Sequence, residues 1–192
     1  MAIFRKNTRR LAIAVAVGAV CAGLLAACSN AGTGEVAPKT VGKVDLQRYQ
    51  GTWYELARLP MFFQRNCAQS EAHYALKPDG SVAVLNRCKT ADGEWEEASG
   101  TATQQVPGQS DKLWVVFDNW FSRLAPGLAK GNYWIIDLDS DYRQAVVGAP
   151  DRKYLWLLSR TPTVSEEVKQ RMLARARQQG FDTSRLIWRA PD

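Results

Sequence analysis

The sequence predicts an all-β domain that ends in one α-helix and a short additional strand. Strand-like runs follow one another from residue 52 to residue 160, and the helical spacing comes only after Pro162. A series of strands followed by a single helix is typical of an antiparallel barrel or sandwich rather than of alternating βαβ units. We therefore expect an antiparallel sheet that closes around its own core.

Eight strands are predicted from apolar and β-branched runs that are bounded by turn signals. The connections are mostly short and polar or rich in Gly and Pro, such as the turn at 77–80. The segment 119–130 is apolar and aromatic for a loop, so we expect it to cover one end of the domain. The predicted strands are 52–59, 68–76, 81–88, 94–105, 112–118, 131–139, 144–148 and 154–160.

One amphipathic helix is predicted after the eighth strand. Residues 163–166 read Thr-Val-Ser-Glu, which fits a capping box that starts at Thr163. Apolar residues then recur at helical spacing, at Val164, Val168, Met172 and Ala176. Gly180 supplies a C-terminal stop, and a ninth short strand follows at 185–189. We expect this helix to pack against the outside of the strands.

The first 27 residues are predicted to be an export signal. Basic residues within 5–10 precede the uncharged apolar run 11–27. The sequence Leu-Ala-Ala-Cys that ends at Cys28 resembles a lipoprotein signal box, in which the Cys is acylated, for example with palmitate, and becomes the first mature residue. Ser29 rather than Asp follows the Cys, which in Gram-negative lipoproteins usually means sorting to the outer membrane. The alternatives are a conventional secretory signal and an uncleaved membrane anchor, since about 17 apolar residues is the lower limit for spanning a bilayer.

The basic character of the chain belongs mostly to this signal. Residues 1–27 hold four Lys or Arg and no acids, so their removal lowers the net charge from +6 to +2. The remaining basic residues are interspersed with acids, and a nucleic-acid-binding surface is not expected. Residues 28–44 contain three Gly and one Pro and are predicted to be a flexible tether, which leaves 45–192 as a single domain.

Two cysteines, Cys67 and Cys88, lie in the exported domain, where oxidising conditions favour a disulfide. If the hairpin between them pairs Leu76 with Ser81, both cysteines fall on the same face of the sheet, one diagonal step apart. A small β-bulge would then bring them into bonding range. Two free thiols are the alternative.

Three separated motifs resemble the conserved regions of the lipocalin family, and within it those of bacterial outer-membrane lipocalins related to apolipoprotein D. The motifs are Gly51-x-Trp53, the segment 139–142 with Asp141 and Tyr142, where Ser140 replaces the usual Thr, and the segment 159–162 with Arg160. The resemblance extends over about residues 45–190. It implies an eight-stranded up-and-down barrel that is open at one end and has a cavity for one small hydrophobic ligand. It also implies that Trp53 closes the other end with Arg160 stacked on its indole ring, so that the motif residues are structural.

Alternation along each strand predicts which side chains line the cavity. Glu71 and His73 share one face of the second strand, which places its apolar face inward. The resemblance chooses the inward face in the sixth and eighth strands. In the fifth strand periodicity leaves both faces open, because Trp114 and Val116 are as apolar as their neighbours. The predicted ligand-binding residues, each with ordinary barrel packing as its alternative, are Ala72, Tyr74, Leu76, Leu113, Val115, Phe117, Tyr133, Ile135, Tyr154, Trp156 and Leu158.

An apolar wall with a few phenol and indole groups suits an acyl chain whose polar head lies near the mouth of the barrel. Each buried CH₂ group contributes about 0.8 kcal/mol, so a long chain gains affinity without a specific head-group site. We therefore expect a fatty acid or lysophospholipid as the partner of a lipid-anchored protein at the outer membrane, facing the periplasm. A homodimer is left open.

The sequence argues against an enzyme. It contains no His-Glu-x-x-His, Gly-x-Ser-x-Gly or Cys-x-x-Cys motif and no Gly-rich phosphate loop. The single histidine, His73, is expected on the outside of the barrel. Asp137, Asp139 and Asp141 alternate, but they lack the spacing and the Gly of a Ca²⁺ loop, so neither a metal nor a cofactor is expected. The alternatives that stay open are an envelope scaffold whose cavity is filled by its own side chains and a lipid-modifying enzyme.

Overall fold

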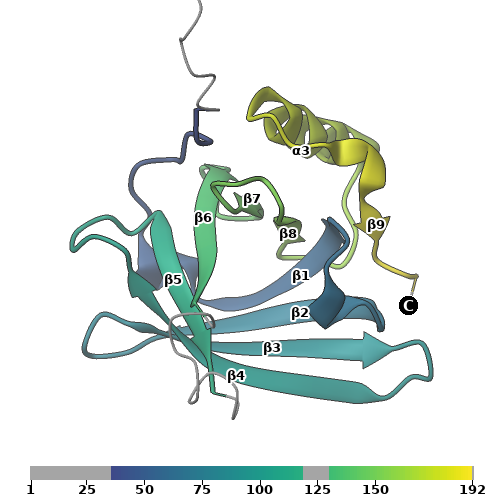
Figure 1. Cartoon of the computed structure of the whole chain (residues 1–192), viewed down its shortest axis with the longest axis horizontal. Coiled ribbons are helices and arrows are strands. Elements are labelled where there is room, and N and C mark those ends of the chain that lie inside the picture. The colour runs from purple at the N-terminus through teal and green to yellow at the C-terminus, as the bar shows by residue number, and fades with distance from the viewer. Residues whose placement is uncertain (1–35, 119–129, 192) are drawn as a thin grey trace, which may run out of the picture. The chain divides into compact units, whose positions relative to one another are not determined.

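The computed structural model of the protein describes residues 36–118 and 130–191, and Ala37–Asp192 forms one compact unit. Within the described residues, nine strands form one antiparallel sheet in the order β2-β3-β4-β5-β6-β7-β8-β1-β9, and β1 also pairs with β2 (Figure 1). The predicted fold, an eight-stranded up-and-down barrel with a short ninth strand, is confirmed. The strands are β1 (Gly51–Arg58), β2 (Cys67–Leu76), β3 (Val82–Thr90), β4 (Trp95–Gln104), β5 (Lys112–Phe117), β6 (Lys130–Leu138), β7 (Gln144–Gly148), β8 (Leu155–Ser159) and β9 (Ile187–Trp188).

Alternation along the strands produces two separate apolar clusters. One fills the barrel and includes Trp53, Tyr74 and Leu158. The other lies on the outer surface of the barrel, where Leu155 and Leu157 of β8 pack with residues of α3 (Glu166–Gln178). The helix therefore covers the outside of the strands, as predicted (Figure 1).

The predicted C-terminal end of α3 agrees with the structure, whereas the predicted N-terminal cap does not. The N-cap is Ser165, whose Oγ accepts a hydrogen bond from the Val168 N–H at 3.3 Å, so the predicted capping box at Thr163 is wrong. Gly180 ends the helix as expected, with φ +84°, a left-handed conformation that favours Gly. The next N–H, of Phe181, donates to the carbonyl of Ala176 at 3.1 Å, which satisfies a carbonyl of the last turn.

A β-bulge in β1 changes which side chains enter the barrel. Trp53 lies opposite Ala72, and alternation puts Glu55 on the same inner face. The register of β1 against β8 then shifts between Glu55 and Ala57, and Arg58 lies opposite Trp156. Because the extra residue reverses the alternation, Arg58 points into the barrel rather than away from it.

The disulfide between Cys67 and Cys88 is formed, although the hairpin register differs from the predicted one. Leu76 pairs with Val82, not with Ser81, because residues 77–81 form the connection and the Lys77 N–H donates to the Ser81 carbonyl at 2.8 Å. The predicted bulge is present between Cys67 and Gln69. It brings the two Cα atoms to 5.4 Å, within the range of disulfides.

Replacing both Cys67 and Cys88 with Ser is expected to lower the free energy of unfolding by about 3 kcal/mol, because the bond closes a loop across a sequence separation of 21 residues. Urea titrations of the wild type with and without a phosphine reductant measure this loss. The double variant is the control, since its midpoint must not respond to the reductant. An unchanged wild-type midpoint under reduction would contradict a stabilising role.

The folded unit begins earlier than the predicted boundary at residue 45. The Val41 N–H donates to the carbonyl of Ile135 at 3.1 Å, and the Val44 N–H donates to Ser110 Oγ at 2.8 Å. Val44 is buried. The C-terminal part of the predicted tether therefore packs on the barrel, where it bonds a backbone carbonyl of β6 and the Ser110 hydroxyl on the β4–β5 connection. The predicted signal (1–27), Cys28 and the loop 119–129 lie outside the described residues.

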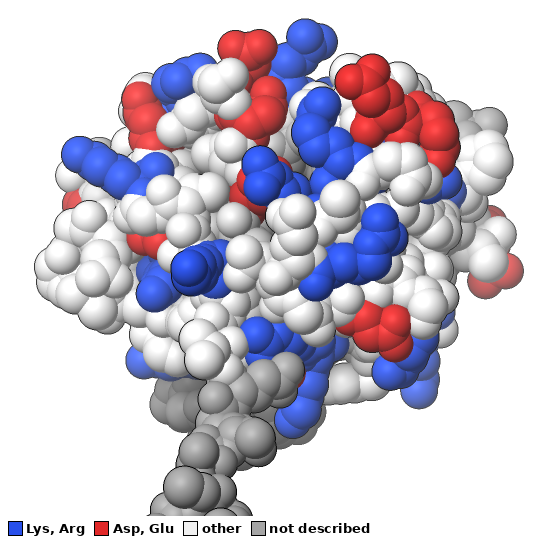
Figure 2. All heavy atoms as spheres, turned by 90° about the horizontal axis from the view of Figure 1, so that it is seen from above, with Lys and Arg blue, Asp and Glu red and all other residues white. Residues whose placement is uncertain are grey.

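Charges of both signs are mixed on the surface. Figure 2 shows Lys and Arg side chains interspersed with Asp and Glu over the face that it presents. His73 is exposed, with its Nδ1 3.2 Å from Thr52 Oγ1. In the part of the chain that the structure describes, no helix is long and apolar enough to cross a membrane.

Candidate functional site

One end of the barrel is closed by Trp53, which is fully buried. Its indole N–H donates to the carbonyl of Tyr49 at 2.8 Å, in the short helix α1 (Leu46–Tyr49). The Arg160 guanidinium carbon lies 4.0 Å from the centre of the indole ring. Such a cation–π contact contributes about 0.5–2 kcal/mol, more when it is shielded from water.

Arg160 also ties three chain segments together at this end. Its guanidinium donates to the carbonyls of Tyr142 at 3.2 Å, Thr52 at 2.9 Å and Arg48 at 3.0 Å. The β6–β7 turn, the start of β1 and the end of α1 are thus held by one side chain. A planar cation suits this task, because it can stack on a ring while each of its three nitrogens donates to a carbonyl at its edge.

The backbone conformation at position 51 favours Gly. Its φ is +89°, and a Cβ at this position would lie 3.4 Å from Arg160 Nη1. Left-handed backbone is costly for residues with a side chain, so a substitution here strains the start of β1. The first residue of the motif is therefore constrained by its left-handed backbone at the start of β1, two residues before Trp53.

In the second motif, the Asp139 carboxylate organises the β6–β7 turn. Asp139 Oδ1 accepts hydrogen bonds from the N–H groups of Arg143 and Gln144, each at 2.6 Å. Asp141 is exposed, and its N–H donates to Asp139 Oδ2 at 3.3 Å. Tyr142 adopts φ +60°, and its hydroxyl accepts the Asp45 N–H at 3.0 Å.

Ten of the eleven predicted wall residues belong to the interior cluster, and Tyr154 does not. Tyr154 precedes β8 and lies at the rim, with its ring centre 6.0 Å from that of Trp156 and 5.7 Å from that of Phe63. Alternation together with the family resemblance therefore predicted the inner face. In β5, where periodicity left both faces open, the structure places Leu113, Val115 and Phe117 on the inner face. Contact of these residues with a ligand stays a prediction.

Three tyrosines fill the barrel next to Trp53. The Tyr133 hydroxyl lies 2.8 Å from that of Tyr49 and 3.1 Å from that of Tyr74. Burial raises the pKa of Tyr74 to about 12 and raises the pKa of Tyr49 and Tyr133 well above the usual value. All three are therefore neutral at physiological pH. The cavity beside them has a volume of about 10 Å³, which is room for roughly one water molecule.

The inner face becomes accessible toward the opposite end, as β4 shows. Gly100 and Ala102 of β4 pair with Val84 and Val82 of the neighbouring strand β3. Gly100 and Ala102 are both buried. Ala98 continues the same inner face opposite Asn86, and it is exposed. The interior is thus closed at the Trp53 end and reaches solvent at the other end, which we call the mouth.

Near the mouth, the barrel contains a buried ion pair that sequence analysis did not identify. Arg58 Nη1 donates to Glu55 Oε1 at 2.8 Å, and the two side chains are only 2% and 7% exposed. Arg58 Nη2 donates to the carbonyls of Gln64 at 2.8 Å and Cys67 at 2.9 Å. The guanidinium is therefore anchored to the first residue of β2 and to η1 (Phe62–Gln64).

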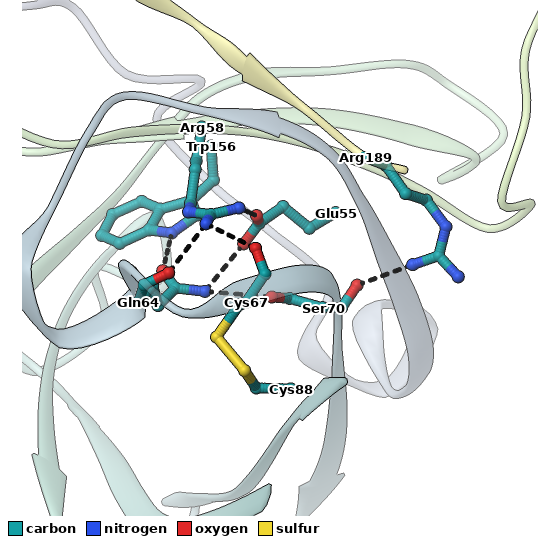
Figure 3. Close-up of polar contacts among 8 residues, drawn as sticks. All are labelled: Glu55, Arg58, Gln64, Cys67, Ser70, Cys88, Trp156 and Arg189. Atoms are coloured by element: carbon teal, nitrogen blue, oxygen red, sulfur yellow. Dashed lines mark hydrogen bonds and ion pairs between the residues drawn. A yellow bond between two sulfur atoms is a disulfide. The ribbon is translucent and has the colours of Figure 1, made fainter. Parts of the chain in front are cut away.

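The Gln64 side chain completes this network (Figure 3). Its Oε1 accepts the Trp156 indole N–H at 3.1 Å, and its Nε2 donates to Glu55 Oε2 at 3.0 Å and to Ser70 Oγ at 3.3 Å. Arg58 Nε is buried and has no hydrogen-bond partner among the described residues. Buried polar groups are normally paired, so this unused donor is an exception within the barrel.

Burial raises the pKa of Glu55, and the adjacent Arg58 and the hydrogen bond from Gln64 oppose this effect. The carboxyl is therefore easier to protonate than a surface glutamate. Alternation from Trp53 was a signal for Glu55 on the inner face. No local signal existed for Arg58, because the bulge that turns it inward depends on the pairing of β1 with β8.

Within residues 36–118 and 130–191, no group of three or more His, Cys, Asp or Glu side chains is arranged to hold a metal ion. What the interior offers is apolar surface, three neutral phenols and one guanidinium–carboxylate pair near the mouth.

A closed antiparallel barrel with one plugged end and an apolar interior that opens at the other defines the class of cup-shaped β-barrels. Residues 44–191 match the family model of the lipocalin-like domain, and the chain belongs to the lipocalin family. The prediction of this family from the three motifs is confirmed.

Similar proteins support this assignment. The chain is 42% identical over 171 residues to the outer membrane lipoprotein Blc of Escherichia coli strain K12, covering 88% of this chain and 92% of that protein. It is 31% identical over 137 residues to apolipoprotein D of Bos taurus, covering 68% of each. The solved structure of insecticyanin from the tobacco hornworm Manduca sexta matches with a TM-score of 0.61 at 20% identity, covering 82% of this chain and 85% of that one. The last likeness supports the fold alone.

Proposed function

We propose that this protein binds, stores or transports one small hydrophobic ligand, a fatty acid or a lysophospholipid, in the barrel. The observation that carries the proposal is the inner face, which is mostly apolar and aromatic toward Trp53 and which, among the described residues, reaches solvent at the mouth. An acyl chain gains about 0.8 kcal/mol for each CH₂ group that it buries, so an apolar cup open at one end favours a chain-like ligand. Lipocalins are binding and transport proteins rather than enzymes, so we do not propose a lipid-modifying enzyme.

Lipid extraction of the purified protein followed by mass spectrometry tests this function, together with titration by a fluorescent fatty acid. We expect a co-purifying acyl lipid and a probe that unlabelled fatty acid displaces. A matched pair of variants locates the site. Ala98→Trp fills the inner face at the mouth and is expected to weaken probe binding at least about tenfold, which corresponds to about 1.4 kcal/mol. Ser99→Trp, on the outer face of the same strand, should leave binding unchanged.

A second candidate is an envelope scaffold whose barrel is filled by its own side chains. The tyrosine cluster and the cavity of about 10 Å³ beside it favour this candidate. A protein that carries no lipid after purification and binds no displaceable probe would support the scaffold and exclude the carrier.

We also propose that the protein is attached to the outer membrane, facing the periplasm, through an acylated Cys28. Support comes from the sequence around Cys28 and from similar proteins that are named outer membrane lipoproteins. Several acyl chains give lasting attachment, whereas a single chain holds only marginally.

Replacing Cys28 with Ser is expected to release the protein from the membrane fraction without changing probe binding, because the acylation site and the barrel are separate parts of the chain. Cell fractionation and immunoblotting measure the release. Cys21→Ser, the other cysteine of the signal region, is the control and should stay with the membranes. Wild-type protein in the soluble fraction would argue against lipidation.

A further inference from the structure

We propose that the Arg58 guanidinium and the Trp156 indole N–H form the binding site for the anionic head group of the ligand, and that Gln64 occupies this site when the barrel is empty. The proposal rests on the proposed lipid-binding function and adds a chemical preference to it. The head group would be a carboxylate or a phosphate, since both present negatively charged oxygens to N–H donors.

The first support is the position of Arg58 within the apolar barrel. Its side chain is 2% exposed, and it lies on the inner face opposite Trp156, close to the mouth. A ligand whose acyl chain points toward Trp53 would place its polar end at this height. A buried guanidinium offers a planar set of donors that matches two oxygens of a carboxylate or phosphate.

The second support is the unused donor of Arg58. Nε is buried and has no hydrogen-bond partner among the described residues, while Nη2 donates to the backbone carbonyls of Gln64 and Cys67. Cys67 belongs to β2 and is fixed by the barrel and the disulfide. Gln64 belongs to η1, so its carbonyl is the acceptor that can leave to make room for a head group.

The third support is the way Gln64 fills this space. Its side-chain carbonyl accepts the Trp156 N–H at 3.1 Å, and its main-chain carbonyl accepts from Arg58 at 2.8 Å. The two neutral carbonyl oxygens of Gln64 thus accept from Trp156 and Arg58, the same two donors that we propose for the two oxygens of an anionic head group. Met61 at the start of η1 is buried, but the neighbouring Phe62 and Phe63 are 79% and 53% exposed, so these two residues of η1 add little apolar burial that would oppose a shift of Gln64.

The exchange is favourable because hydrogen bonds from a guanidinium to a charged oxygen are roughly twice as strong as those to a neutral one. Glu55 opposes an incoming anion when it is ionised. Its pKa is already raised by burial, so it can take up a proton as the anion arrives. The groups that face its carboxyl are Arg58, Gln64 and, at longer range, Arg189.

Matched neutral and anionic ligands test the proposal on the full-length protein. Palmitic acid is compared with methyl palmitate, and a monoacylglycerol phosphate with the monoacylglycerol, by displacement of a fluorescent probe. We expect the wild type to prefer the anionic member by at least about tenfold. The pair with the larger preference distinguishes a carboxylate from a phosphate as the favoured head group.

Variants assign the preference to these residues. Arg58→Met is expected to abolish the preference while methyl palmitate still binds. Gln64→Ala is expected to tighten binding of the anion several-fold, because it removes the internal occupant. Trp156→Phe removes one N–H while it keeps an aromatic ring, and it provides a second test if Arg58→Met does not fold. Arg65→Met, an exposed cation on the same loop, is the control and should change nothing.

Equal affinity of the wild type for the acid and its ester would overturn the proposal, and so would a preference that survives in both Arg58→Met and Trp156→Phe. Unchanged anion affinity in Gln64→Ala would overturn the role of Gln64 as the occupant. These results differ from failure of the proposed function, in which neither the anionic nor the neutral ligand binds.

Discussion

Replacing Trp53 with Ala is expected to lower the free energy of unfolding by about 3–5 kcal/mol, as for other truncations of a large core residue. The indole is fully buried, donates to the carbonyl of Tyr49 and carries the Arg160 guanidinium on its face. Its removal leaves a cavity at the closed end and takes away the ring on which Arg160 stacks. Urea unfolding followed by circular dichroism measures the loss.

Trp95→Ala is the matched control, because Trp95 is 40% exposed and lies at the start of β4 near the mouth. It is expected to cost less than about 1 kcal/mol, as is usual for surface positions. A loss below about 1 kcal/mol for Trp53→Ala would show that Trp53 does not close the barrel. The comparison therefore separates the general effect of losing a Trp from the effect of opening this end.

Replacing Arg58 with Met is expected to destabilise the protein by about 3–5 kcal/mol at pH 8, because it leaves the Glu55 carboxylate buried without a counter-ion. The loss should be smaller at pH 5. Burial already raises the pKa of Glu55, and Arg58 opposes this rise, so the substitution raises the pKa further. A carboxyl with a raised pKa in the folded state contributes stability at low pH that is lost as pH rises through that pKa. Urea titrations at the two pH values measure the difference.

The double variant Glu55→Gln, Arg58→Met removes both charges, and its stability should return to within about 1 kcal/mol of the wild type at both pH values. Lys169→Met breaks the exposed pair with Glu166 on α3 and is expected to cost less than about 1 kcal/mol. A pH-independent loss in Arg58→Met would show that Glu55 is not the group left uncompensated.

The two predictions describe two ends of one barrel with different tasks. At the Trp53 end, each of the three guanidinium nitrogens of Arg160 donates to a backbone carbonyl, which favours rigidity. At the mouth, Arg58 retains an unused donor, and one of its acceptors sits on a loop with two exposed phenylalanines. Incomplete pairing at the mouth is what a site for an exchangeable ligand requires, since a fully satisfied network would resist the exchange.

Several features were predictable from the chain because they depend on near neighbours. Alternation, combined with the family resemblance, predicted ten residues of the inner face, and the helical spacing ending at Gly180 identified the helix. The cysteine pair was predictable from the hairpin between the two residues, even though the assumed pairing of Leu76 with Ser81 was wrong by one residue. Tyr154 was predicted in the wall but lies at the rim, because β8 begins only at Leu155.

Other features were decided only by the folded barrel. Arg58 lies inside because β1 shifts register against β8, a strand about 100 residues later in the chain. The tyrosine cluster forms because α1, β2 and β6 converge, and nothing within any of these segments indicates that their hydroxyls meet. Side-chain alternation and turn residues act over a few positions, so they can be recognised in sequence. The pairing that closes a barrel joins distant segments, and the polar contacts at its mouth follow from that closure.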